Sequence, residues 1–270
     1  MVKFIACDMD GTLLDSKKQM PENFEYVLEE LKKRGIIFAI SSGRQYDSLN
    51  KQFEHIRDKI YIIAENGACV YDDKGERLLS DPLDKESCVE IIEKLIDEKD
   101  LYLVVCGAKS AYGEACNKPI LQHVLPYYIK YETVESSSEA SRKDDIYKIA
   151  VFDGQGSEKH CYPMLSDYYE SHNVLVSGDD WLDVMKKGVT KGTAIKQLQK
   201  KLCISRDECM AFGDFMNDYD MMKECEESYA MENAHPELKA ICKHIAPSND
   251  DNGVMRTICE VFGIEEAPQK

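Results

Sequence analysis

Residues 4–12 read FIACDMDGT, an apolar run that ends in two aspartates, Asp8 and Asp10, separated by one residue. The run predicts a buried strand, and open α/β sheets bind their ligands at the carboxyl ends of such strands. Side chains two apart on an extended chain point to the same side. Two like charges about 4 Å apart repel by about 4 kcal/mol at an effective dielectric of 20. The pair therefore needs compensation, and a divalent cation is the obvious candidate.

The composition is that of an acidic globular protein. The chain has 270 residues, 43% of them hydrophobic, and a formal net charge of −16. Such a surface repels nucleic acid and anionic lipid, so neither is expected as a partner, and a phosphorylated ligand would need a local positive site. The eleven cysteines are scattered singly, without zinc-ligand spacing. With no signal-like or membrane-spanning run, we expect a cytoplasmic protein.

Helix and strand patterns alternate at both ends of the chain. In the amino-terminal part, an apolar stripe at positions 24, 27, 28 and 31 predicts a helix, and buried-strand patterns at 36–40 and 60–64 flank a helix expected at 45–54. The alternation returns at Lys191, with helices expected at 191–202, 217–225, 236–242 and 253–262, and strands at 208–212, 228–231 and 243–246. This order predicts an α/β fold with a doubly wound, Rossmann-like parallel sheet.

The middle of the chain has another pattern. A hairpin is expected over 69–79, a helix over 85–98, strands at 101–106, 147–152, 174–177 and 181–185, and helices near 118–125 and 157–170. The polar, serine-rich stretch 135–145 is interpreted as an exposed loop. We therefore expect a core formed by residues 1–82 and 188–270, with an α+β domain inserted at 83–187.

Reactive side chains follow several expected strands or begin the next helix. In a parallel sheet these ends share one edge, so distant residues can converge there. The residues in question are Asp8, Asp10, Ser42, Lys191 and Asp214, with Asn217 and Asp218 at the start of a helix. Taken singly, each has a plainer interpretation: a turn for the acidic pair and Ser42, a solvated lysine for Lys191, and helix capping for Asn217 and Asp218. Asn66 most simply makes a turn.

Together these segments resemble the haloacid dehalogenase superfamily. Its four motifs match, in order, Asp8-x-Asp10-Gly11-Thr12, Ser42-Gly43-Arg44, Lys191-Gly192 and Gly213-Asp214-x-x-Asn217-Asp218. The inserted region is similar to a type C2 cap, and the surroundings of the motifs resemble the Cof-type (IIB) branch of Mg²⁺-dependent phosphatases. The family commonly has threonine where Ser42 stands, and serine keeps the hydroxyl.

The resemblance implies a role for each motif residue. Asp8 would attack phosphorus and Asp10 would serve as general acid and base. Mg²⁺ would be held by Asp8, the Asp10 carbonyl and Asp214, while Asp218 supports the metal or orients Lys191. The expected phosphate and substrate contacts are Met9, Ser42, the Gly43 N–H, Lys191 and Asn217.

The expected function is hydrolysis of a small phosphorylated metabolite, foremost a sugar phosphate, with Mg²⁺ as cofactor. Three alternatives stay open: a phosphotransferase or mutase, a phospho-accepting signalling module, and a haloalkanoate dehalogenase. Phosphate release separates the first from a hydrolase, and the second aspartate favours turnover over signalling. A dehalogenase needs no metal. The sequence indicates neither the substrate nor the oligomeric state.

Overall fold

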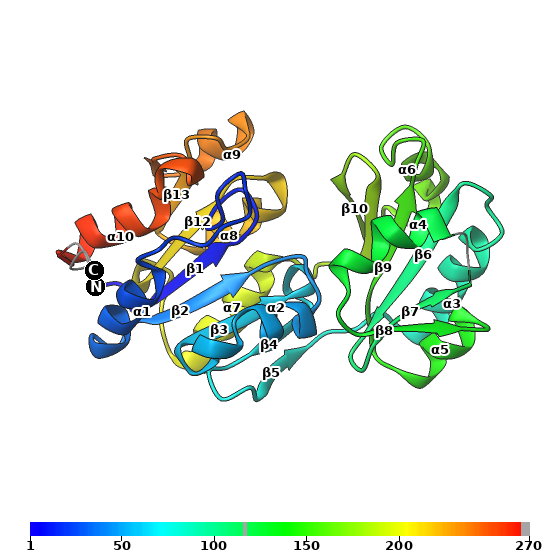
Figure 1. The fold of residues 1–270 in the computed structure, drawn as a ribbon, viewed down its shortest axis with the longest axis horizontal. Helices are drawn as coiled ribbons and strands as arrows, with labels where there is room; N and C mark the ends of the chain where they lie inside the picture. The colour runs from blue at the N-terminus through cyan, green and yellow to red at the C-terminus, as the bar shows by residue number, and fades with distance from the viewer. Residues whose placement is uncertain (116–117, 266–270) are drawn as a thin grey trace. The chain divides into compact units, whose positions relative to one another are not determined.

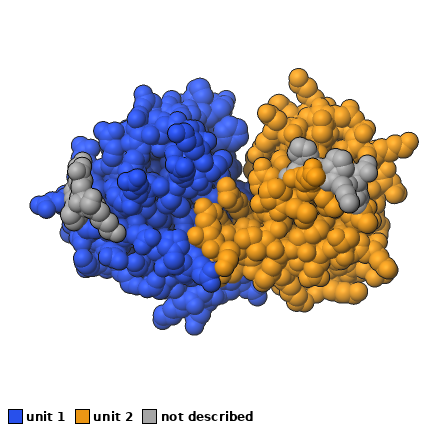
Figure 2. Space-filling model, in the orientation of Figure 1, with its two compact units in different colours: residues 1–43, 53–79, 190–270 blue, residues 44–52, 80–189 orange. Residues whose placement is uncertain are grey.

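The computed structural model describes residues 1–115 and 118–265, and this part of the chain divides into two compact units (Figure 2). The first unit comprises Met1–Gly43, Phe53–Leu79 and Thr190–Lys270. The second comprises Arg44–Gln52 and Ser80–Val189. The sequence led us to expect residues 44–52 in the core. They group with the second unit because Ser48 Oγ donates to the Tyr127 carbonyl at 3.0 Å and Lys130 Nζ lies 2.6 Å from Asp47 Oδ1.

The first unit is built on a sheet with the strand order β14-β13-β12-β1-β2-β3-β4-β5 (Figure 1). Pairing is parallel from β14 to β3 and turns antiparallel between β3 and β4. The predicted α/β fold with a doubly wound sheet is confirmed. The strands are β1 (Phe4–Asp8), β2 (Ile37–Ser41), β3 (Ile60–Ala64), β4 (Cys69–Tyr71), β5 (Arg77–Ser80), β12 (Cys209–Gly213), β13 (Glu227–Met231) and β14 (His244–Ala246).

Helices pack against this sheet through their apolar stripes. In α1 the stripe is buried, and the Phe24 ring meets the Phe38 ring of β2 edge-on at 5.7 Å between centroids. Burying one such side chain stabilises the fold by about 1.5–3 kcal/mol. The helices of this unit are α1 (Phe24–Lys33), α7 (Lys191–Leu202), α8 (Tyr219–Glu224), α9 (Pro236–Ile241) and α10 (Gly253–Phe262), with 3₁₀ turns at Glu54–Lys59, Glu65–Gly67, Arg206–Glu208, Met216–Asp218 and Asn249–Asp251.

The second unit has its own sheet, in the order β10-β11-β9-β6-β7-β8. Its pairs are antiparallel except β7 with β8. The strands are β6 (Leu101–Gly107), β7 (Ala111–Glu114), β8 (Tyr131–Val134), β9 (Ile146–Asp153), β10 (His172–Gly178) and β11 (Trp181–Lys186). The helices are α2 (Tyr46–Gln52), α3 (Lys85–Leu95), α4 (Lys118–Val124), α5 (Ser137–Lys143) and α6 (Cys161–Met164), with 3₁₀ turns at Leu125–Tyr127 and Ser166–Tyr168.

Two expectations for this unit are wrong. The stretch 135–145, expected as a loop, contains α5, and its serine-rich start is a capping signal: Ser136 Oγ accepts the N–H of Glu139 at 3.2 Å. The helix expected over 157–170 is reduced to α6 and a 3₁₀ turn. Pro163 explains this, because proline donates no N–H and is tolerated only in the first turn of a helix.

None of the helices within residues 1–115 and 118–265 combines the length and the apolar character needed to cross a membrane.

Candidate active site

The ends of neighbouring parallel strands position the predicted carboxylates and hydroxyl. Asp8 is the last residue of β1, Ser42 directly follows β2, and Asp214 directly follows β12. Since β1 pairs with β2 on one side and β12 on the other, all three residues lie at one edge of the sheet. The fold therefore gathers segments that are more than two hundred positions apart in the chain.

Lys191 reaches the same edge from the first turn of α7. The helix starts there because the side chain of Thr190 accepts the N–H of Thr193 at 3.1 Å and its own N–H bonds to the Thr193 hydroxyl. The Lys191 ammonium donates to Asp8 Oδ1 at 2.5 Å and to Asp218 Oδ1 at 2.7 Å. A single cation thus joins two of the predicted acidic residues.

These charged side chains are buried, and burial shifts their pKa values. Burial lowers the pKa of Lys191, but the charges of Asp218 and Asp8 outweigh it and raise the pKa above its usual value. Burial also raises the pKa of Asp8 well above its usual range, against the opposing effect of Lys191. The pKa of Asp214 is raised to about 6, mainly by burial and then by the charge of Asp218. The site holds more negative charge than Lys191 compensates.

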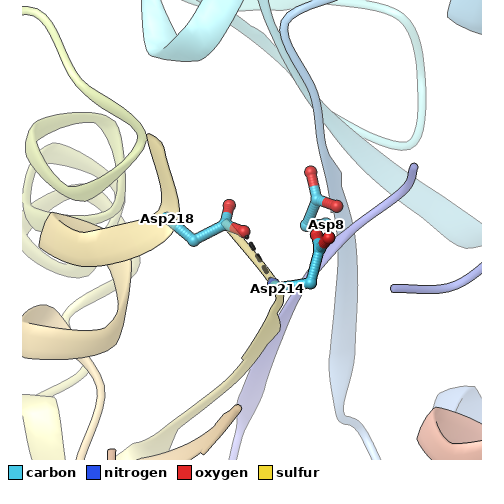
Figure 3. Close-up of side chains that lie close together, drawn as sticks. All are labelled: Asp8, Asp214 and Asp218. Atoms are coloured by element: carbon cyan, nitrogen blue, oxygen red, sulfur yellow. Dashed lines mark hydrogen bonds between the residues drawn. The ribbon is translucent and has the colours of Figure 1, made fainter. Parts of the chain in front are cut away.

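Asp8, Asp214 and Asp218 form a carboxylate cluster, in which one oxygen of each lies within 4.8 Å of the others (Figure 3). The Thr12 hydroxyl donates to Asp214 Oδ1 at 3.0 Å. Within residues 1–115 and 118–265, the buried Asp8 Oδ2 atom has no hydrogen-bond partner. An unpartnered buried oxygen next to further carboxylates fits a hard divalent cation.

Asp218 is engaged on both of its oxygens. Oδ1 accepts from Lys191, and Oδ2 accepts the N–H groups of Asp214 at 3.0 Å and Phe215 at 3.2 Å. Of the two roles that the sequence left open for it, the geometry favours orienting Lys191 over binding a metal directly. Asp218 also fixes the turn that carries Asp214.

Asp10 lies beside the cluster rather than in it. Its side chain is partly exposed, and Lys18 Nζ donates to Asp10 Oδ1 at 2.9 Å. Met9, by contrast, is fully buried, so the structure shows no accessible Met9 atom for the expected substrate contact.

Asn66 was interpreted from the sequence as a turn residue whose place at a strand end allows a substrate contact, and it was not among the expected site residues. Its N–H bonds the Ser42 carbonyl at 3.0 Å, and its Oδ1 accepts from Asn217 Nδ2 at 3.3 Å. A Cβ on Gly43 would lie 3.0 Å from the same Oδ1. Asn66 therefore links the Ser42–Gly43 turn to Asn217. Its place two residues after the end of β3 was the signal, but a turn explained that place more simply.

Gly11 allows the loop after β1 to pass close to Asp214. Its φ is +82°, and an added Cβ would lie 2.3 Å from Asp214 Oδ2. We expect Gly11→Ala to destabilise the protein by about 1–2 kcal/mol, the cost of a left-handed non-glycine residue, and to displace the Asp214 carboxylate. Urea unfolding measures the first effect. Wild-type stability of this variant would contradict the close approach.

The sequence model of the haloacid dehalogenase-like hydrolases matches residues 5–258. The chain belongs to this family. It is 32% identical to the 5-amino-6-(5-phospho-D-ribitylamino)uracil phosphatase YbjI of Escherichia coli K12, over 99% of this chain and 98% of that protein. The resemblance predicted from the four motifs is therefore confirmed, and the protein is an enzyme of the phosphoric monoester hydrolase class.

Solved structures share the fold of this chain. The crystal structure of SMU.1108c from Streptococcus mutans UA159 is similar with a TM-score of 0.87 and 30% identity, covering 97% of this chain and all of that one. The subclass IIB sugar phosphatase BT4131 has a TM-score of 0.82 at 20% identity, covering 98% of this chain and 100% of that one. At that identity the likeness concerns the fold.

Proposed function

We propose that this enzyme is a Mg²⁺-dependent phosphatase that hydrolyses a small phosphorylated metabolite, foremost a sugar phosphate, through an aspartyl-phosphate on Asp8. One observation carries the proposal: Lys191 holds one carboxylate oxygen of Asp8, while the other is buried and unpartnered beside Asp214. A nucleophilic carboxylate next to a lysine and a cation site is what attack on a phosphate dianion requires.

The cation would be held by Asp8 and Asp214, with the Asp10 carbonyl as a further oxygen ligand and Asp218 behind Lys191. Carboxylate and carbonyl oxygens are the ligands that Mg²⁺ prefers. Its charge would offset the negative charge of the phosphoryl group as it is transferred.

In the first step an Asp8 oxygen attacks phosphorus and the bond to the leaving oxygen breaks. Asp10 gives its proton to that oxygen and is left as a carboxylate. In the second step Asp10 takes a proton from water, the water oxygen attacks phosphorus, and Asp8 and inorganic phosphate are released. Lys191, Ser42, the Gly43 N–H and Asn217 would contact the phosphoryl oxygens.

The proposed substrate class is based on the chemistry of the compound that a relative acts on. YbjI, by its name, acts on a phosphorylated ribityl compound, which is a polyol phosphate monoester. We propose the first unit as the catalytic core and the inserted second unit as a cap that selects the leaving group. We also propose a cytoplasmic location, because the cysteines within the described residues are free thiols and most of them are buried.

Inorganic phosphate release from a panel of sugar phosphates, nucleotides, pyridoxal phosphate and flavin mononucleotide tests the proposal. We expect release from at least one sugar phosphate with Mg²⁺ and none after chelation. Transfer to an added sugar without phosphate release would instead support the phosphotransferase or mutase. A stable phosphoprotein without turnover would support the signalling module, and chelator-resistant halide release the dehalogenase.

Asp214→Asn is expected to weaken Mg²⁺ binding by about 10–100-fold, because it removes a negative oxygen ligand. Isothermal titration of the enzyme with MgCl₂ measures the affinity directly. Asp207→Asn, an exposed aspartate before β12, is the matched control and should bind as the wild type does. An unchanged Mg²⁺ affinity in the Asp214 variant would remove Asp214 from the ligand set.

A further inference from the structure

Lys18 is a lysine outside the four motifs that contacts a motif residue. Its ammonium lies 2.9 Å from Asp10 Oδ1. The pair is exposed, with 62% of the Lys18 side chain and 34% of the Asp10 side chain accessible, so it contributes little to stability. A contact that contributes little to folding and engages a proton-transfer residue calls for a functional explanation.

The backbone of Lys18 supports this view. Its φ is +62°, a left-handed conformation that a non-glycine residue adopts only at a cost. The turn is held in place by Asp15, whose carbonyl accepts the Lys18 N–H at 2.9 Å and whose Oδ1 accepts the N–H of Gln19 at 2.8 Å. Local strain of this kind persists only where surrounding contacts enforce it, and it clusters at functional sites.

The whole loop is also anchored from the far end of the chain. Asn233 Nδ2 donates to the Gly11 carbonyl at 2.8 Å, and Asn249 Nδ2 donates to the Leu14 carbonyl at 2.9 Å. Asp250 Oδ1 accepts the N–H of Ser16 at 2.7 Å. These bonds tie the backbone of the loop between Asp10 and Lys18 to the core of the first unit.

We propose that Lys18 is a positioning residue for Asp10: it holds the carboxyl group in the orientation from which the acid's proton reaches the leaving oxygen. The inference rests on the proposed function. In the first step Asp10 loses its proton to the leaving alcohol, and the ammonium steadies the carboxylate that results. In the second step the same contact keeps that carboxylate directed at the attacking water.

Leaving-group dependence tests this role. A sugar phosphate releases an alkoxide and needs the proton, whereas p-nitrophenyl phosphate releases a weakly basic phenolate that does not. We expect Lys18→Met to lower kcat/KM for the sugar phosphate by about tenfold or more, part of the 10²–10⁴-fold that a general acid contributes, and to leave p-nitrophenyl phosphate within about twofold. The KM for the sugar phosphate and the urea midpoint should stay unchanged, and Lys18→Arg should restore most of kcat/KM.

Lys17→Met is the matched control, since it removes the same charge from the neighbouring exposed position. It should act on both esters as the wild type does. Equal losses of Lys18→Met on both esters, or a loss confined to KM, would overturn the positioning role while leaving the phosphatase intact. A wild-type enzyme that cleaves neither ester would overturn the proposed function, and the inference with it.

Discussion

Asp8→Asn is expected to abolish phosphate release, lowering kcat by about 10⁴-fold or more, the scale seen when a covalent nucleophile is removed. The amide has the shape of the carboxylic acid but cannot attack phosphorus. The same substitution should not weaken the fold. Burial raises the pKa of Asp8 well above its usual range, so the charged carboxylate is less favourable in the folded than in the unfolded state, and asparagine removes that charge.

The prediction therefore has two parts, measured on metal-free protein and on the complete enzyme. Phosphate release with Mg²⁺ reports the loss of turnover, and urea unfolding without metal should show a midpoint at or above that of the wild type. Asp97→Asn, at an exposed position beyond α3, is the matched control and should change neither phosphate release nor the urea midpoint. Near-normal turnover would remove Asp8 as the nucleophile. A large drop in the midpoint would mean that activity was lost through unfolding.

Lys191→Met should have the largest effect on stability. It removes the cation between Asp8 and Asp218 and leaves two buried carboxylates without this counter-charge. Breaking a buried ion pair in this way costs about 3–5 kcal/mol of unfolding free energy. The variant should also lose about 10²–10³-fold in kcat, the usual effect of deleting one group that stabilises the transition-state charge.

Lowering the pH should restore part of the stability that Lys191→Met loses. Burial already raises the pKa of Asp8 in the folded state, and loss of the opposing Lys191 charge raises it further. The folded form of the variant therefore gains stability as the pH falls and loses it as the pH rises. Urea unfolding between pH 5 and pH 8 should show the gap to the wild type narrowing toward pH 5.

Lys196→Met is the control for this experiment, because it removes an exposed lysine of the same helix that lies 3.5 Å from Glu224. Lys196→Met should lower the unfolding free energy by less than about 1 kcal/mol at any pH. If Lys191→Met lowered the unfolding free energy as little as the control does, Lys191 would not be the counter-charge of the two aspartates.

Local sequence patterns sufficed for the elements of the first unit. The strands are nearly continuous apolar runs and the helices carry one apolar stripe, and these periods follow from how each backbone exposes its side chains. The elements of the second unit were harder to predict from sequence patterns. The helix α5 consists of seven mostly polar residues and was mistaken for a loop, and the four-residue strand β7 is too short to give a separate signal.

By itself, the sequence determined the family, the parallel sheet and the residues whose chemistry suits phosphoryl transfer. The tertiary structure alone decided what those residues do to one another. It showed that Asp218 holds Lys191 and the Asp214 turn, that Asn66 bridges to Asn217, and that Lys18 reaches Asp10. The physical reason is that hydrogen bonds and ion pairs act over about 3 Å in space, whatever the separation along the chain. A pattern along the chain records which groups are present, and only the packed strands and loops bring them within that reach.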